Sequence, residues 1–247
     1  MKTVDKALGV LDQFSLENRE LGLSELARMA GLDKAATRRL LVAMAKHGFI
    51  EQSVETKKYR LGHGFLRLAR IREATVPVSR IAQEAVDRLV GETNETAHVS
   101  LPGALGMVTI AHRLPNRGRV IKINPAELLF YHATASGLAY LAFATDATRD
   151  RLLSLKRDKI AQETITDEAS LRTALKGFQA QGYSQTRNSF ESDVASVGMT
   201  FQDGDDDPTG AIALALPKAD MTDARRAELL PLLREAVARI ERALTGL

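Results

Sequence analysis

The sequence predicts an α+β fold in two parts: a small helical unit with a β-hairpin, and a larger unit in which helices flank a largely antiparallel sheet. Charge divides the chain in the same way, because residues 1–78 carry a net charge of +5 and the remainder carries −2. Apolar residues recur at helical spacing through most of the first 73 residues, whereas strand-like segments cluster after residue 95. A basic helical part therefore precedes a larger mixed part.

Length and composition are those of a globular protein with room for two hydrophobic cores. The 247 residues are 45% hydrophobic and 26% charged, and no apolar run approaches the roughly 20 residues of a membrane span. The absence of cysteine excludes disulfides and Cys-ligated metal sites. The first residues lack a hydrophobic signal core, so we expect a cytoplasmic protein with no membrane segment.

Local patterns predict the first three helices. Residues 3–15 have apolar side chains at helical spacing, and residues 24–50 contain two short helices joined by a tight turn. Ser24 is expected to cap the first helix of this pair, Gly31 to end it, and Asp33 to cap the second. This arrangement is typical of a helix-turn-helix.

The second helix of the pair, which begins at Lys34, has two unlike faces. The aliphatic face consists of Thr37, Leu40, Leu41, Met44 and Gly48. The opposite face, which carries the cations, consists of Ala35, Arg38, Arg39, Val42 and Lys46. A helix that packs one face on a core and presents arginines on the other has the layout of a recognition helix in the DNA major groove. An ordinary amphipathic hairpin with a solvated charged face is the alternative.

A β-hairpin, or wing, is predicted directly after this helix. Residues 49–52 and 58–61 are strand-like, and the segment between them has turn composition. Lys57, Lys58 and Arg60 place positive charge at or beside the tip. Residues 34–60 hold seven Lys/Arg and two acids, and this local charge of +5 predicts contacts with phosphates.

A further helix is predicted over residues 64–73, where Phe65, Leu68 and Ile71 form an apolar strip with Ala69. Pro77 is expected to end the segment, because proline disfavours the helical region for the residue before it. The strip is a candidate seam between two copies of the chain. The alternative is that it only caps its own domain.

The larger part is predicted to combine helices and strands. A helix over residues 79–94 precedes strands at 96–101, 107–112 and 120–123. The other helices are expected at 136–145, 148–155, 168–181 and 222–244, and the other strands at 182–185, 196–202 and 210–216. Strands clustered between flanking helices are typical of a largely antiparallel α+β domain.

Residue spacing gives little support to an enzyme or a metal site. No metal-ligand spacing joins the histidines, which are His47, His63, His98, His112 and His132. Ser136 lacks the preceding glycine of a nucleophile elbow. The aspartates at 203 and 205–207 lie beside Gly204 and Pro208, which is typical of a solvated turn. His132 is interpreted as a satisfied buried group, with a catalytic base as the weaker alternative, and we expect no catalytic residue, metal or cofactor.

Short motifs in the first part carry a resemblance to a known family. They are Ala7-Leu8-Gly9-Val10-Leu11, Leu23-Ser24-Glu25-Leu26-Ala27, Gly31-Leu32-Asp33-Lys34, Arg39-Leu40-Leu41 and Tyr59-Arg60-Leu61-Gly62. In these motifs the chain resembles the winged-helix domain of the IclR family of bacterial transcription regulators. Ala35 and Ala36 depart from it, because they replace the usual Ser-Thr, so the operator sequence cannot be taken from relatives. The charge pattern and the resemblance together predict DNA contacts at Ser24, Lys34, Ala35, Ala36, Arg38, Arg39, Lys57, Lys58 and Tyr59.

The second part also resembles this family, in its effector-binding domain. The motifs are residues 132–142 (HATASGLAYLA), Ile165-Thr166-Asp167 and Gly182-Tyr183. The chain departs from the family at Thr186 and Arg187, which stand in the acidic stretch, at Ser196, which replaces a usual cysteine, and at Ala213-Leu214-Ala215. The resemblance implies an effector site at Leu129, Ala135, Ser136, Thr186, Arg187, Val194, Ser196, Ala213 and Ala215. Its small side chains favour a larger or more apolar ligand, such as an aromatic organic acid.

The sequence therefore predicts a DNA-binding transcriptional regulator that responds to a small organic molecule. Its parts are a winged helix-turn-helix domain at 1–63, a linker helix at 64–78 and an effector-binding domain at 79–247. The expected partners are a palindromic double-stranded operator, a carboxylate effector, and one or three further copies of the chain in a homodimer or homotetramer. Two alternatives are a regulator whose second domain contacts only protein partners, and an enzyme built on that domain.

Overall fold

The computed structural model describes residues 2–75 and 78–246, and its backbone separates into two compact units, Met1–Pro77 and Val78–Leu247. Each unit has its own hydrophobic core. The expected helix end at Pro77 lies outside the described residues. Within the described ranges, no helix is long and apolar enough to cross a membrane.

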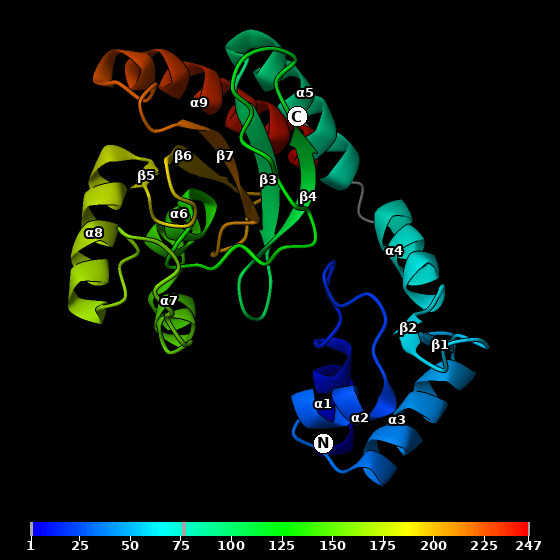
Figure 1. Cartoon of the computed structure of the whole chain (residues 1–247). Helices are drawn as coiled ribbons and strands as arrows, with labels where there is room; N and C mark the ends of the chain where they lie inside the picture. The colour runs from blue at the N-terminus through cyan, green and yellow to red at the C-terminus, as the bar shows by residue number, and fades with distance from the viewer. Residues whose placement is uncertain (1, 76–77, 247) are drawn as a thin grey trace. The chain divides into compact units, whose positions relative to one another are not determined.

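The N-terminal unit consists of four helices and a two-stranded hairpin (Figure 1). Its elements are α1 (Lys2–Leu11), α2 (Leu23–Met29), α3 (Lys34–Lys46), β1 (Ile50–Gln52), β2 (Tyr59–Leu61) and α4 (Gly64–Thr75). Strands β1 and β2 pair antiparallel, with Glu51 opposite Arg60. Val10, Leu26, Leu41 and Ile50, which come from the first three helices and the hairpin, form the centre of its core. The winged helix-turn-helix predicted from the sequence is confirmed.

The turn between α2 and α3 forms as the local sequence predicts. Gly31 has a left-handed φ of 63°, which glycine adopts without a steric penalty. The Asp33 carboxylate accepts a hydrogen bond of 2.7 Å from the Ala36 amide and so caps α3. The predicted cap at Ser24 is wrong, because α2 begins at Leu23 and its N-cap is Gly22, so Ser24 lies inside the first turn.

Helix α4 leaves most of its apolar side chains exposed within its unit. Leu66, Leu68 and Ile71 are 59%, 43% and 49% exposed, and no described residue of this helix is buried. Phe65 differs from them, since its ring packs edge-on against Phe49 with centroids 5.0 Å apart. The helix therefore joins its own unit at its first turn and presents an uncovered apolar strip beyond it.

The C-terminal unit is a five-stranded antiparallel sheet with helices on both faces (Figure 1). Its helices are α5 (Val78–Thr93), α6 (Ala135–Phe143), α7 (Asp146–Leu153), α8 (Glu168–Gln181) and α9 (Asp223–Thr245). Its strands are β3 (Thr96–Pro102), β4 (Met107–Arg113), β5 (Ser184–Arg187), β6 (Val194–Phe201) and β7 (Gly210–Pro217), in the order β4-β3-β7-β6-β5. Helices α5 and α9 cover one face, and α6 covers the other with α7 and α8 beside it.

The central strand β7 is buried along its whole length, which its almost uninterrupted small and aliphatic sequence allows. Helix α6 is nearly as buried and approaches the sheet very closely. A Cβ on Gly198 of β6 would lie 2.8 Å from the Ala135 carbonyl oxygen, and a Cβ on Gly137 would lie 2.5 Å from Tyr131 Cα. Glycine at 198 therefore lets the start of α6 rest directly on the sheet, and glycine at 137 lets the chain at Tyr131 pack against the helix.

One predicted strand is absent. The segment at residues 120–123 has no regular structure, and the Thr96 hydroxyl donates to the Ile121 carbonyl at 2.8 Å where a ladder bond was expected. The aspartate-rich segment forms a turn between β6 and β7, as predicted. Asp207 in this turn accepts hydrogen bonds from the Thr145 amide at 2.7 Å and the Thr148 hydroxyl at 2.6 Å. The Asp207 carboxylate therefore fixes the position of the first turn of α7 through these two hydrogen bonds.

Gly137→Ala is expected to destabilise the protein by roughly 1–3 kcal/mol, because the added methyl group would overlap the backbone of Tyr131. Gly177→Ala is the matched control, because a Cβ at that position of α8 meets nothing within 4 Å. The control should stabilise by roughly 0.5–1 kcal/mol, the usual gain for Gly→Ala inside a helix. Calorimetric melting of the full chain measures both, and equal melting temperatures would contradict the close approach of α6.

Candidate functional site

Helix α3 has the two faces that its sequence predicts. Thr37, Leu41 and Met44 are buried, whereas Arg38 and Arg39 are exposed on the opposite side. The Thr37 hydroxyl donates to the Asp33 carbonyl at 2.9 Å, which adds to the cap at the helix start. The pKa of the Asp33 carboxyl is lowered, mainly by the Ala36 amide and further by Arg39, so the cap is ionised at neutral pH.

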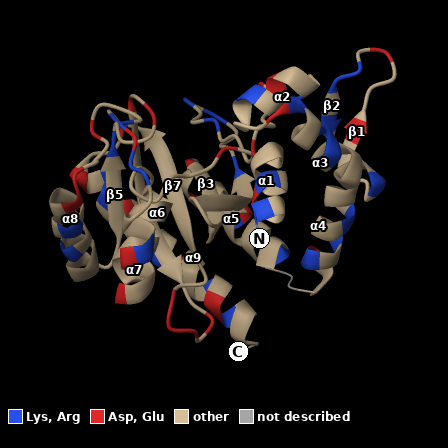
Figure 2. Ribbon diagram, turned by 90° about the horizontal axis from the view of Figure 1, so that it is seen from below, with Lys and Arg blue, Asp and Glu red and all other residues tan. Residues whose placement is uncertain are grey.

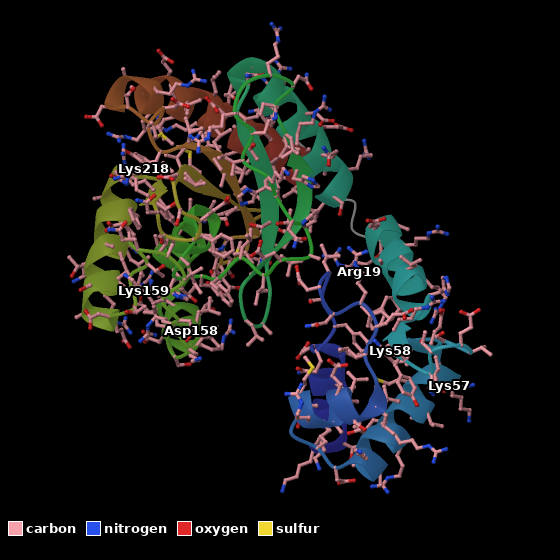
Figure 3. The ribbon with its side chains drawn as sticks, viewed as in Figure 1. Arg19, Lys57, Lys58, Asp158, Lys159 and Lys218 are labelled. Carbon is pink, nitrogen blue, oxygen red and sulfur yellow. The ribbon has the colours of Figure 1, made fainter. Side chains whose placement is uncertain are left out.

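The wing presents two lysines from a tight turn. Lys57 has a left-handed φ of 57°, and its carbonyl accepts a hydrogen bond of 2.8 Å from the Gln52 side chain. The Ser53 amide donates to the Lys58 carbonyl at 2.9 Å and closes the loop. Both lysine side chains are exposed, and Figure 3 labels them on the hairpin.

Residues from α2, α3 and the wing line one open concavity of the N-terminal unit. Its lining consists of Gly22, Leu23, Ser24, Glu25, Arg38, Val42, Gln52, Thr56, Lys57, Lys58 and Tyr59. The structure thus brings together Ser24, Arg38, Lys57, Lys58 and Tyr59 from the predicted DNA-contacting set. The remaining members, which are Lys34, Ala35, Ala36 and Arg39, lie outside this lining.

The cations of this unit are not equivalent. Arg60 lies 3.2 Å from Glu51 and 3.8 Å from Glu20, so its charge is compensated. Arg38, Lys57 and Lys58 form no ion pair in the part of the chain that the structure describes. Figure 2 shows the basic residues along α3, β2 and α4. Tyr59 is only 8% exposed and its backbone pairs with Leu21, so its position is fixed by the core.

The C-terminal unit contains a cavity between the sheet, the start of α6 and two loops. The cavity has a volume of about 80 Å³, whereas a single water molecule needs roughly 10–15 Å³. Its lining consists of His98, Ile121, Lys122, Ile123, Asn124, Glu127, Leu129, Thr134, Ala135, Thr186, Ser189, Phe190, Glu191, Val194, Ser196 and Ala215. The cavity therefore has room for an organic molecule of several heavy atoms.

Strand register places the floor of this cavity. Thr186 lies opposite Ser196, and Ser196 lies opposite Ala215, so one row across β5, β6 and β7 supplies small side chains. The row two residues further on contains Gly198, Ala213 and His98, and α6 rests on it. Helix α6 therefore covers Gly198 and Ala213 in the second row, whereas the first row and His98 line the cavity.

Of the predicted effector residues, those in the cavity lining are Leu129, Ala135, Thr186, Val194, Ser196 and Ala215. Ala213 is fully buried in the row beneath α6. Ser136 is also fully buried and lies behind the wall, with its hydroxyl 3.5 Å from His98 Nε2. Arg187 donates to the Met221 carbonyl and lines a different, open surface depression.

The sequence-based prediction did not include His98, the loop residues 121–124, or Phe190. His98 is 9% exposed, and burial, with a further effect of His112, lowers its pKa to about 4 from an ordinary value of 6.5. It is therefore neutral at physiological pH. A histidine in a strand of buried residues was the available signal, but only the lining of the folded cavity shows that its side chain reaches it.

The walls differ in polarity between the interior and the rim. Lys122, Glu127 and Glu191 are exposed, so the charged residues of the lining lie at its outer edge. Thr134 caps α6 through a hydrogen bond of 3.1 Å from the Gly137 amide. His132 is 5% exposed and its Nε2 lies 2.9 Å from the Asp158 carbonyl, so it is the satisfied buried group that the sequence predicted.

Comparisons with known proteins match both units to one family. The model described as "IclR helix-turn-helix domain" matches residues 3–53, and "Bacterial transcriptional regulator IclR C-terminal" matches residues 74–242. The HTH-type transcriptional regulator XynR of Escherichia coli (strain K12) is 24% identical over 245 residues, which cover 99% of this chain and 97% of that protein.

Solved structures of whole chains agree with this match. A putative IclR transcriptional regulator from Silicibacter sp. TM1040 has a TM-score of 0.91 and 33% identity, and the match covers 99% of this chain and 97% of that chain. An IclR homolog complexed with 4-hydroxybenzoate, from Microbacterium hydrocarbonoxydans, has a TM-score of 0.81 and 21% identity, covering 99% of this chain and 100% of that chain. At this identity, the similarity to the Microbacterium structure shows a shared fold and nothing more.

Stability is expected to fall as the pH drops from about 6.5 to about 4, because the unfolded state binds a proton at His98 that the folded state excludes. The contribution is fully present above this window, and its loss amounts to about 3 kcal/mol at about 1.4 kcal/mol per pKa unit. Urea unfolding of wild type and His98→Leu at several pH values measures it. The variant should show a shallower decline, with His47→Gln as the control, and identical declines in wild type and His98→Leu would contradict a buried neutral His98.

Proposed function

The chain belongs to the IclR family of bacterial transcriptional regulators, and we propose that it is an effector-responsive member whose C-terminal unit senses a small organic acid. The observation that carries this proposal is a cavity with an uncovered floor of small side chains beside the start of α6. The N-terminal unit binds DNA, and occupancy of the cavity changes operator affinity or the recruitment of polymerase.

We assign different roles to the cations of the N-terminal unit. Arg38 and Arg39, exposed on α3, read base edges in the major groove. Lys34, Lys57 and Lys58 contact phosphates, for which a lysine serves as a point charge. Ala35 and Ala36 offer no hydroxyl to the DNA, while Ser24 and the rigidly held Tyr59 lie at the margin of the concavity. The operator sequence therefore depends on the arginines more than in relatives with hydroxyls at 35 and 36.

We further propose that the chain acts as a homodimer, or as a tetramer built from two dimers, on a palindromic operator. One recognition helix reads only a short half-site, so useful specificity requires a symmetric pair. The uncovered strip at Leu66, Leu68 and Ile71 on α4 supports an interface there. An effector that favours one arrangement of the dimer then changes the spacing of the two DNA-binding units.

The proposed effector is an aromatic acid or one of similar size. Ala135, Ser196 and Ala215 leave room in the cavity, and its interior has few charged groups. The first amides of α6 and the positive end of its dipole favour a carboxylate at the cavity edge. The IclR homolog from Microbacterium hydrocarbonoxydans, which was crystallised with 4-hydroxybenzoate, supports an acid of this size.

Single substitutions should separate the two kinds of DNA contact. Lys58→Ala should weaken operator and random DNA alike and reduce the salt slope by about 0.9 per subunit, one released counterion. Arg38→Ala should reduce discrimination between operator and random DNA by roughly 1–3 kcal/mol. Arg60→Ala is the control. It should change the salt slope less than Lys58→Ala does, because the Arg60 charge is already paired with Glu51 and Glu20. Fluorescence anisotropy at several salt concentrations measures each, and an unchanged operator-to-random ratio in Arg38→Ala would overturn its role.

A thermal-shift screen of aromatic, aliphatic and dicarboxylic acids tests the effector. An aromatic acid at a hundred times its Kd should stabilise the wild type by about 2.7 kcal/mol. Ala215→Leu should lose this response, because the added side chain fills the cavity floor. Arg187→Ala, outside that lining, should keep it. An equal response in Ala215→Leu would place the ligand elsewhere, and the absence of any response would favour a domain that contacts only protein partners.

A further inference from the structure

His98 lies in the cavity wall with hydrogen-bonding capacity that the protein leaves unused. Its side chain is 9% exposed, and Nδ1 has no hydrogen-bond partner among the described residues. Three hydroxyls, at Ser100, Thr109 and Thr209, are also buried without a partner, but they do not line this cavity. A buried polar atom without a partner costs stability, so its presence in a side chain that lines a cavity points to a ligand group.

The other ring nitrogen of His98 is held only weakly. The Thr134 hydroxyl donates to the Phe130 carbonyl at 3.1 Å and accepts from the Gly137 amide at the same distance. The Ser136 hydroxyl is then shared between Thr134 at 3.4 Å and His98 Nε2 at 3.5 Å, and both contacts are long. Helix α6 therefore fixes Thr134 firmly and leaves the imidazole without a strong partner.

The charge distribution of the wall limits what can bind beside His98. The ring is neutral at physiological pH, because burial and the nearby His112 hold its pKa at about 4. The charged lining residues Lys122, Glu127 and Glu191 are exposed at the rim. A carboxylate beside the ring would be buried without a cation, which is unfavourable. An uncharged hydroxyl suits this position, since a neutral imidazole can accept from it or donate to it.

We propose that His98 selects the effector, and that the effector is a hydroxylated organic acid whose hydroxyl group bonds the imidazole while its carboxylate lies toward α6 or the rim. This inference rests on the proposed acid-sensing function and names its ligand more narrowly. Thr186 and Ser196 on the cavity floor add hydroxyls on the other side of the same space. An acid without the hydroxyl leaves the imidazole unpaired and binds more weakly.

The test compares benzoate with its three monohydroxy isomers and their methyl ethers, by calorimetric titration of the full-length protein. The wild type should bind at least one hydroxy acid about tenfold more tightly than benzoate, the gain expected of one hydrogen bond to an otherwise unpaired group. The methyl ether should lose most of this gain, because it cannot donate and is larger.

Two substitutions and one control isolate the contribution of His98. His98→Leu should reduce the preference for the hydroxy acid to about onefold, while its unliganded melting temperature should stay equal or rise, because an unpaired buried nitrogen is removed. His98→Gln keeps hydrogen-bonding groups and should retain part of the preference. Thr109→Val removes a buried, unpartnered hydroxyl that does not line the cavity, and it should leave the preference unchanged.

The outcomes separate failure of this inference from failure of the proposed function. If acids bind but His98→Leu keeps the wild-type preference, or if Thr109→Val loses it as fully as His98→Leu does, the role of His98 is overturned and the acid-sensing function stands. If none of these acids, nor any acid of the wider screen, binds a protein that still binds DNA, the acid-sensing function fails and this inference fails with it.

Discussion

The close contact between helix α6 and the sheet is the constraint on which the C-terminal unit depends. Because Gly198 on β6 has no Cβ, the helix start can rest on the backbone of the sheet, and because Gly137 on α6 has none, the turn at Tyr131 can pack against the helix. The same contact covers Ala213, whereas Thr186, Ser196 and Ala215 of the neighbouring row line the cavity, together with His98 at the other end of the covered row. Packing at two glycines thus decides which side chains a ligand can reach.

The N-terminal unit depends on local interactions instead. Gly31 and Asp33 turn the chain and start α3 within a few residues, and the spacing of Leu41 and Met44 then fixes which face turns inward. Arg38 and Arg39 are exposed because the opposite face is buried, not because they have partners of their own. The surface proposed to read DNA therefore follows directly from the burial of the core.

These two cases explain what the sequence could predict. The faces of α3, the turn and the wing follow from patterns within about a dozen residues, so their prediction was confirmed in every main feature except the cap at Ser24. The cavity joins residues that are distant in the sequence, from His98 on β3 to Ala215 on β7, and the strand register that brings them together is encoded by no local pattern. Resemblance to a family supplied Thr186, Ser196 and Ala215 as candidates, but not His98. The irregular segment at 120–123 was misread as a strand, because alternating apolar residues also suit a loop packed on a sheet.

The residues that line the cavity come from two kinds of backbone, regular strands and irregular connecting segments. Its floor belongs to the hydrogen-bonded sheet, whereas Ile121, Ile123 and Phe190 come from connecting segments without regular structure. Substitutions in those segments alter the shape of the binding space without disturbing the strand ladder. Ligand preference can therefore change through substitutions in these segments, while the strand register that holds the domain together stays the same.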